Sequence, residues 1–144
     1  MSFMHATPFT VEFGDCDPAQ IVFYPNFLRW TDAASLRFFA AAGIAPWHQR
    51  ADAAHDGIIG TPVVEINVRF VAPATYGDAV VVETTVTDWR RTSFVMDHRI
   101  CRGDTLLVTA RETRIFARRH PNDPRRIEAV PIPADIRDRF EPVA

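Results

Sequence analysis

The spacing of hydrophobic residues predicts one strand, then one long helix, then a series of strands. Hydrophobic and polar residues alternate over residues 8–13, as they do in a half-buried strand. The run Gly-Asp-Cys-Asp-Pro at 14–18 consists of turn-forming residues and ends that strand. A helix is expected from Pro25, a favoured first helical residue, to about Ala42, with Gly43 as the residue that terminates it.

The predicted helix is apolar over most of its circumference. One stripe at three- to four-residue spacing consists of Phe27, Trp30, Ala33, Ala34, Phe38 and Ala41. Much of the remaining surface is also apolar, through Leu28, Leu36, Phe39 and Ala40. At 1.5 Å per residue this helix is about 26 Å long. We expect a helix of this composition to be wrapped by other structure instead of lying on the outside.

After Gly57 the sequence changes to long runs rich in Val, Thr, Ile and Phe, which predict strands. The expected strands are 63–70, 79–90, 93–102 and 106–117. Short segments of turn residues separate these runs, so neighbouring strands should be antiparallel. Outside them, residues 45–56 should hold a short helix, and residues 131–140 a final short strand and a helical turn.

With 144 residues the chain has the size of a single domain, which we take as residues 1–144. A curved antiparallel sheet wrapped around the long helix satisfies both hydrophobic patterns and gives an α+β fold. Sheet surfaces that the helix does not cover still carry Val and Phe. We therefore expect the outer face and the edges of the sheet to meet another subunit, in a homodimer at least.

Composition and charge exclude several classes of function. The net charge of −2 gives no overall field that would attract nucleic acid. The sequence has no run of about 18 apolar residues and no signal peptide, which predicts a cytoplasmic protein without a membrane partner. Cys16 and Cys101 lack zinc-ligand spacing, the five histidines are scattered, and glycine motifs for nucleotide cofactors are missing, so neither a metal nor a cofactor is expected.

The residues from Glu12 to Phe27, EFGDCDPAQIVFYPNF, resemble the start of the 4-hydroxybenzoyl-CoA thioesterase family of hotdog proteins. The family pattern is D-x-D-P/A-x-x-x-V-x-Y/F, followed by Asn and the hotdog helix. The resemblance covers most of residues 9–117 and includes Trp30, Asp32-Ala33-Ala34-Ser35, Pro46-Trp47, Gly60-Thr61-Pro62, Trp89-Arg90-Arg91 and Ser93-Phe94-Val95. The chain departs from the family at Gln20, where the family often has Gly. The resemblance implies a hotdog fold, assembly into a homotetramer or a dimer, and hydrolysis of an aromatic acyl-CoA such as 4-hydroxybenzoyl-CoA.

Asp17 is the catalytic carboxylate that the resemblance implies. An ionised carboxylate can attack the thioester carbonyl to form a mixed anhydride, or it can activate water as a general base. The sequence leaves both routes open, and Asp15 and Asp17 would also suit a simple turn. Tyr24 is implied as the second catalytic group, because its backbone N–H at the start of the helix can polarise the thioester oxygen.

Three residues are candidates for the acyl pocket. Asp32 either binds a polar substituent such as a phenol hydroxyl or pairs with Arg29 three residues earlier on the helix. Trp47 is either an aromatic wall of the pocket or part of the core. Thr61 either contacts the substrate across a subunit boundary or belongs to a turn.

Arg90, Arg91 and Thr92 are candidates for binding the phosphates of CoA, because guanidinium groups bind phosphate oxygens in pairs. The alternative is a solvated hairpin tip. Four further arginines have no individual assignment: Arg118, Arg119, Arg125 and Arg126.

Two other functions remain open at this point. One is a short-chain or fatty acyl-CoA thioesterase of the same superfamily, with the same aspartate and a different pocket. The other is a hotdog module that binds CoA esters, or a protein partner, without catalysis, because one fold supports many functions.

Overall fold

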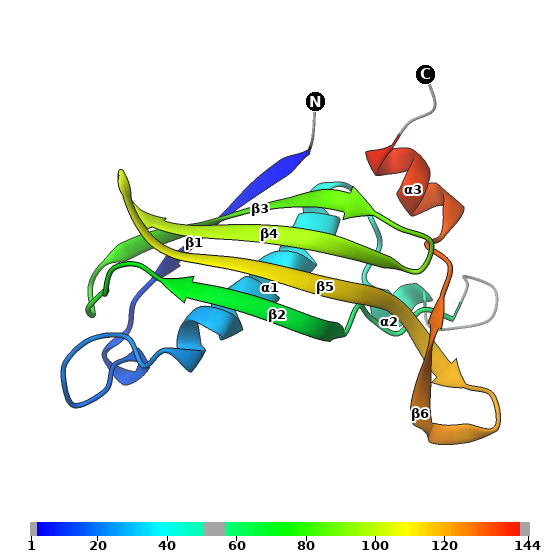
Figure 1. Cartoon of the computed structure of the whole chain (residues 1–144), viewed down its shortest axis with the longest axis horizontal. Coiled ribbons are helices and arrows are strands. Elements are labelled where there is room, and N and C mark those ends of the chain that lie inside the picture. The colour runs from blue at the N-terminus through cyan, green and yellow to red at the C-terminus, as the bar shows by residue number, and fades with distance from the viewer. Residues whose placement is uncertain (1–2, 51–56, 142–144) are drawn as a thin grey trace.

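One antiparallel sheet forms the body of the molecule, as the computed structural model of residues 3–50 and 57–141 shows (Figure 1). Its strands are β1 (Met4–Thr10), β2 (Val63–Phe70), β3 (Ala79–Trp89), β4 (Ser93–Arg102), β5 (Thr105–His120) and β6 (Asp123–Val130). They lie in the order β1-β3-β4-β5-β2, and β6 pairs with the far end of β5. All paired strands are antiparallel. The expectation from the short turns is confirmed for β3, β4 and β5, whereas β2 pairs with β5 and not with β3, the next strand along the chain.

The long helix α1 (Pro25–Ala41) lies against one face of this sheet (Figure 1). It ends before Gly43, whose φ of +85° is the left-handed conformation that suits glycine. The bounds of the predicted helix and the α+β class are therefore confirmed. The sheet of a single chain covers only one side of α1, however, and Leu36 on the other side is 51% exposed. The expectation that other structure covers the helix is confirmed on the side of α1 that faces the sheet.

Two clusters of buried side chains attach α1 to the sheet. The cluster around the first half of α1 includes Phe27, Trp30, Val80, Val82 and Leu107. The cluster around its second half is largely aromatic and includes Phe38, Phe39, Phe94, Phe116 and Ile136. Burial of a large apolar side chain stabilises a fold by about 1.5–3 kcal/mol. These clusters consequently fix α1 relative to β3, β4 and β5, and with it every side chain that α1 carries.

The first strand starts four residues earlier than the sequence pattern predicts and ends three residues earlier. β1 pairs with β3 from Met4 opposite Thr85 to Thr10 opposite Ala79. Because β3 begins at Ala79, the chain leaves the sheet after Thr10, and residues 13–15 form a turn of 3-10 helix instead of continuing the strand. The predicted strand at 8–13 is therefore only partly correct.

The C-terminal part of the chain also differs from the prediction. β5 runs three residues past the predicted end, and β6 occupies residues 123–130, where no strand was expected. The β5–β6 hairpin projects from the body of the sheet (Figure 1), so its residues are mostly exposed and polar, without the hydrophobic alternation of a covered strand. The helical turn at the end is confirmed as α3 (Ala134–Phe140), whereas the strand predicted within 131–140 is wrong.

The short helix predicted within 45–56 is α2 (Trp47–Arg50), and residues 51–56 lie outside the described part of the chain. The guanidinium of Arg50 contacts both carboxylate oxygens of Asp135 at 2.8 and 3.0 Å. This ion pair joins α2 to α3. The Asp135 carboxylate also accepts hydrogen bonds from backbone N–H groups. Together with the ion pair, these hydrogen bonds lower the pKa of Asp135 despite its partial burial.

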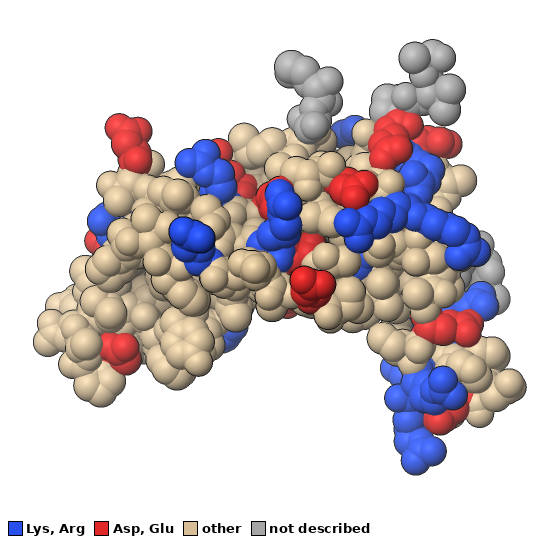
Figure 2. All heavy atoms as spheres, viewed as in Figure 1, with Lys and Arg blue, Asp and Glu red and all other residues tan. Residues whose placement is uncertain are grey.

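The outer face of the sheet is more polar than the sequence pattern suggested. Positively and negatively charged side chains are interspersed over it (Figure 2). Arg111 and Asp97, for example, form an ion pair at 2.9 Å. Exposed apolar side chains gather instead on β2 and include Val63, Val64, Ile66 and Phe70. Among the described residues, no helix is long and apolar enough to cross a membrane.

Candidate active site

A tight loop before α1 presents Asp17. Its backbone N–H donates to the carbonyl of Ile21 at 2.9 Å, and its carbonyl accepts the N–H of Gln20 at 2.8 Å. The side-chain carboxylate accepts the N–H of Ala19 at 2.9 Å, which is the local bond that favours aspartate in turns. Gln20, the position where the chain departs from the family pattern, takes a φ of 67°, a left-handed conformation that glycine adopts more easily.

Tyr24 occupies the N-terminal cap of α1, directly before Pro25. Its backbone N–H has no acceptor among the described residues, and the partial positive charge of the helix end lies there. This is the chemistry that stabilises negative charge on an incoming oxygen. The ring of Tyr24 is 59% exposed and meets Phe23 and Phe70 edge-on, so it is not a core residue.

A cavity of about 650 Å³ lies beside the middle of α1. Its lining includes Asp32, Leu36, Trp47, Thr61, Arg114 and Ile127. The three residues predicted for the acyl pocket therefore share one cavity, although Trp47 also packs edge-on against Phe39 of the aromatic cluster. Asp17 and Tyr24 are absent from the described lining, so the predicted catalytic loop does not form a wall of this cavity.

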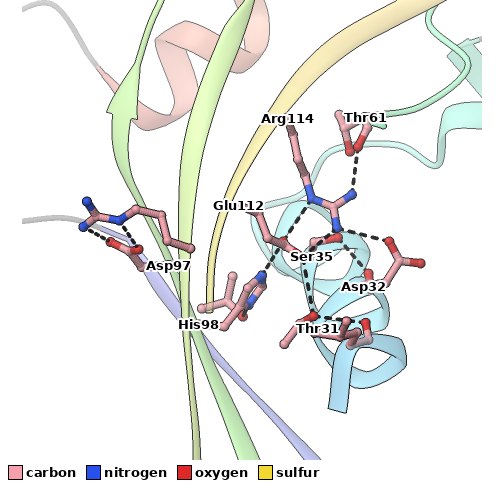
Figure 3. Close-up of polar contacts among 11 residues, drawn as sticks. Thr31, Asp32, Ser35, Thr61, Asp97, His98, Glu112 and Arg114 are labelled. Atoms are coloured by element: carbon pink, nitrogen blue, oxygen red, sulfur yellow. Dashed lines mark hydrogen bonds and ion pairs between the residues drawn. The ribbon is translucent and has the colours of Figure 1, made fainter. Parts of the chain in front are cut away.

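The carboxylate of Asp32 is bound by a residue that the sequence analysis did not consider. Arg114 on β5 donates from Nη2 to Asp32 Oδ1 at 3.1 Å (Figure 3). Arg29 reaches Asn26 instead, so the predicted alternative of a local Arg29–Asp32 pair is wrong. The Asp32 side chain is 74% exposed, whereas that of Arg114 is 4% exposed. Asp32 therefore pairs with a buried cation and is exposed to the cavity.

Behind Arg114 a chain of buried polar groups runs into the sheet (Figure 3). Arg114 donates from Nε and Nη2 to the two carboxylate oxygens of Glu112 at 3.1 and 3.2 Å. Glu112 Oε1 lies 2.6 Å from His98 Nε2, and His98 Nδ1 lies 2.8 Å from the hydroxyl of Thr84. Burial raises the pKa of Glu112, but the hydrogen bonds and charges of His98 and Arg114 outweigh this effect and hold that pKa below its usual value.

Arg90, Arg91 and Thr92 lie together in the turn between β3 and β4. Arg90 donates its backbone N–H to Ser93 and its side-chain Nε to Asp88, both within 2.9 Å. The carbonyl groups of Arg91 and Thr92 accept N–H groups from the segment before α3 and from β5. The turn is thus a fixed hairpin tip with an exposed Arg91 side chain. It does not contribute to the described lining of the acyl cavity.

The four unassigned arginines belong to the β5–β6 hairpin. Arg118 pairs with Glu128 at 2.6 Å, and Arg125 approaches Asp123 at 3.3 Å. Arg119 donates to the carbonyl of Pro124 at 3.1 Å. The contacts of Arg118 and Arg119 join β5 to β6, whereas that of Arg125 lies within β6.

Known proteins share this arrangement over nearly the whole chain. The family model of the thioesterase-like superfamily matches residues 11–140. The chain belongs to the thioesterase-like superfamily. A 4-hydroxybenzoyl-CoA thioesterase from Pseudomonas sp. (strain CBS-3) is 47% identical to this thioesterase over 130 residues, which is 87% of this chain and 89% of that protein.

Solved structures agree with the sequence comparison. A 4-hydroxybenzoyl-CoA thioesterase with the substitution D17N, complexed with 4-hydroxybenzoyl-CoA, matches with a TM-score of 0.88 at 42% identity, over 96% of this chain and 99% of that one. A gentisyl-coenzyme A thioesterase matches with a TM-score of 0.76 at 30% identity, over 92% and 97% of the two chains. The predicted hotdog fold and the predicted thioester hydrolase class are confirmed.

Glu112, Arg114 and His98 of this thioesterase were not predicted as site residues from the sequence. Strand alternation contained the signal, because Glu112 and Arg114 share the phase of the buried Ala110 and Phe116 on β5. A charged residue at an inward position of a strand needs a buried partner. His98 on β4 could be identified as the partner of Glu112 only from the strand order, which places β4 between β3 and β5.

Proposed function

We propose that this thioesterase hydrolyses an aromatic acyl-CoA, such as 4-hydroxybenzoyl-CoA, to the free acid and CoA. The observation that carries the proposal is the cavity beside α1, which has apolar and aromatic walls and, among its described lining residues, one accessible carboxylate, Asp32. A benzoyl ring suits such walls, and an ionised carboxylate accepts a hydrogen bond from a phenol hydroxyl. The 47% identity to a 4-hydroxybenzoyl-CoA thioesterase supports the same substrate.

Asp17 performs the chemistry in this proposal, either as the nucleophile that forms a mixed anhydride or as the general base that activates water. The backbone N–H of Tyr24 and the positive end of α1 stabilise the negative charge that develops on the thioester oxygen. The substrate complex of the D17N relative supports this role, since replacing a reactive aspartate is a direct way to retain an intact substrate.

A second copy of the chain completes the site. Asp17 and Tyr24 do not belong to the described lining of the cavity in their own chain, and we place the substrate between the Asp17 loop of one subunit and the cavity of its partner. The strand β2 supports this arrangement, because it lies at an edge of the sheet and exposes apolar side chains. An apolar edge strand is poorly tolerated in water and pairs readily with another chain. A homodimer is the minimum assembly, and two dimers can form a tetramer.

Coenzyme A enters only as part of the substrate, with its phosphates bound by the turn of Arg90, Arg91 and Thr92. The described residues contain no group of three or more His, Cys, Asp or Glu placed to hold a metal ion. Neither a metal nor a cofactor is part of the proposed reaction. An acyl-CoA substrate and two free cysteines, Cys16 and Cys101, suit the cytoplasm.

The decisive experiment is a panel of acyl-CoA esters assayed for release of free thiol. We expect kcat/KM to be highest for 4-hydroxybenzoyl-CoA and related hydroxyaryl esters. Preference for acetyl-CoA or fatty acyl-CoA would identify the enzyme as a short-chain or fatty acyl-CoA thioesterase instead. Tight binding of acyl-CoA without thiol release would identify a binding module and contradict the proposal.

A further inference from the structure

Arg114 connects the two sides of the acyl cavity. It makes four hydrogen bonds, two to Glu112, one to Asp32 and one from Nη1 to the carbonyl of Thr61 at 2.8 Å. Asp32 is on α1, and Thr61 is in the segment before β2. One buried guanidinium thus ties the helix wall of the cavity to its loop wall.

The groups behind Arg114 restrict where its guanidinium can lie. Glu112 is held by His98 at 2.6 Å and by the hydroxyl of Thr31 at 3.4 Å, and both partners are buried. A carboxylate with this many partners has little freedom to rotate, and the two-pronged bond to Glu112 orients the plane of the guanidinium. Through Arg114, these buried partners therefore set the position of the Asp32 carboxylate.

The charges of this cluster also define the polar end of the cavity. Arg114 contributes one positive charge, and Glu112 and Asp32 contribute one negative charge each, of which only that of Asp32 lies at the surface of the cavity. Glu112 is 2% exposed, and Asp32 is 74% exposed, so Asp32 presents this charge to the cavity. Such a cavity end accepts a hydrogen bond from a neutral donor and repels an anionic substituent.

We propose that Arg114 is a positioning residue that sets the acyl selectivity of this thioesterase. It holds the Asp32 carboxylate where a hydroxyl at the far end of an acyl ring can donate to it, with Glu112, His98 and Thr84 as its support. This inference rests on the proposed function, because it concerns which acyl-CoA the enzyme prefers.

The test compares two substrates that differ by one hydroxyl, 4-hydroxybenzoyl-CoA and benzoyl-CoA. The measured quantity is the ratio of their kcat/KM values in the unmodified enzyme and in variants. We expect Arg114→Gln to lower this ratio about tenfold, the effect of losing one charge-assisted hydrogen bond. Arg114→Lys keeps the positive charge without the planar fork and should lower the ratio less. Arg111→Gln is the matched control, because Arg111 lies on the outer face of the same strand and pairs with Asp97.

A double-mutant cycle separates positioning from general damage to the structure. If Arg114 acts through Asp32, Arg114→Gln lowers the ratio in the natural background and has no further effect on it in Asp32→Asn. Equal losses for both substrates, or additive effects in the double variant, would show that Arg114 is only structural. Should Arg114→Gln not fold, Arg114→Lys decides in the same way, and an unchanged ratio there overturns the inference.

The substrate preference of the unmodified enzyme shows whether this inference or the proposed function has failed. If it shows no preference for 4-hydroxybenzoyl-CoA, the proposed substrate is wrong, and the role of Arg114 is rejected with it. If it shows the preference and the Arg114 variants retain it, the proposed function stands and only the inference fails.

Discussion

Oε1 of Glu112 lies 2.6 Å from Nε2 of His98 on the buried face of the sheet, where the two side chains are 2% and 0% exposed. Two further bonds from Arg114 complete the surroundings of the carboxylate. A carboxylate buried this completely is stable as an anion only while these partners remain. The cluster should therefore determine how the protein responds to acid.

We expect stability to fall in acid because the pKa of Glu112 is lowered in the folded protein. Between its ordinary value, 4.5, and the lower folded value, the unfolded chain takes up a proton and the folded chain does not. The contribution of Glu112 is thus complete above pH 4.5 and is lost as the pH falls through the folded pKa. Thermal unfolding of the natural chain and of Glu112→Gln between pH 7 and pH 3 measures this effect.

At pH 7, Glu112→Gln should lower the free energy of unfolding by about 3 kcal/mol, since it removes one partner of a buried pair. The difference between the two proteins should shrink as the pH is lowered below 4.5. If both lose stability in parallel over the whole range, the lowered pKa of Glu112 is refuted.

Removing the carboxylate of Asp17 should abolish catalysis while leaving the fold intact. Asp17→Asn keeps the size of the side chain and an oxygen for the N–H of Ala19, so the loop should persist. We expect kcat to fall at least about 10³-fold, with a small change in KM, because the lost interaction acts in the transition state.

Asp15→Asn is the control for this variant, since Asp15 accepts the N–H of Glu12 at 2.8 Å and holds the same loop. It should retain turnover close to that of the natural chain. Near-normal turnover in Asp17→Asn, with circular dichroism and mass unchanged, would remove Asp17 from the mechanism.

The turn between β3 and β4 should affect the binding of CoA and not the chemistry. Replacing Arg90 and Arg91 together by Ala should raise KM about tenfold and leave kcat nearly unchanged, because two charge-assisted contacts to phosphate are lost. Steady-state kinetics at low and high salt measures this, with Arg99→Ala on the outer face of β4 as the control. An unchanged KM in the double variant would place the nucleotide elsewhere.

The edge strand β2 should hold the subunits together. Val64→Lys combined with Ile66→Lys puts two charges on a surface that assembly would bury, at a cost of several kcal/mol. We expect light scattering to show a single chain where the natural protein is at least a dimer, and thiol release to be lost at the same time. Met4→Lys places a charge on the opposite edge of the sheet, at β1, and should change neither quantity. Dissociation by Met4→Lys and not by the β2 variant would show that the other edge forms the interface.

Elements with a strong local pattern were predictable, and elements that depend on pairing were not. Pro25 and Gly43 delimit α1 through their own backbone preferences, and the four runs after Gly57 became strands close to the predicted bounds. The start of β1 at Met4 follows from its register with β3, which no local pattern reveals. β6 was missed because its hairpin is largely exposed and therefore lacks hydrophobic alternation.

By itself the sequence determined the α+β class, the family and the residue types that carry the chemistry, because these depend on local spacing and on one uninterrupted motif around Asp17. The tertiary structure alone decided that Asp32, Trp47 and Thr61 share a cavity and that Arg114, not Arg29, holds Asp32. Those contacts join residues up to 82 positions apart along the chain. Their geometry follows from the strand register and from how α1 packs on the sheet, and neither can be derived from local spacing.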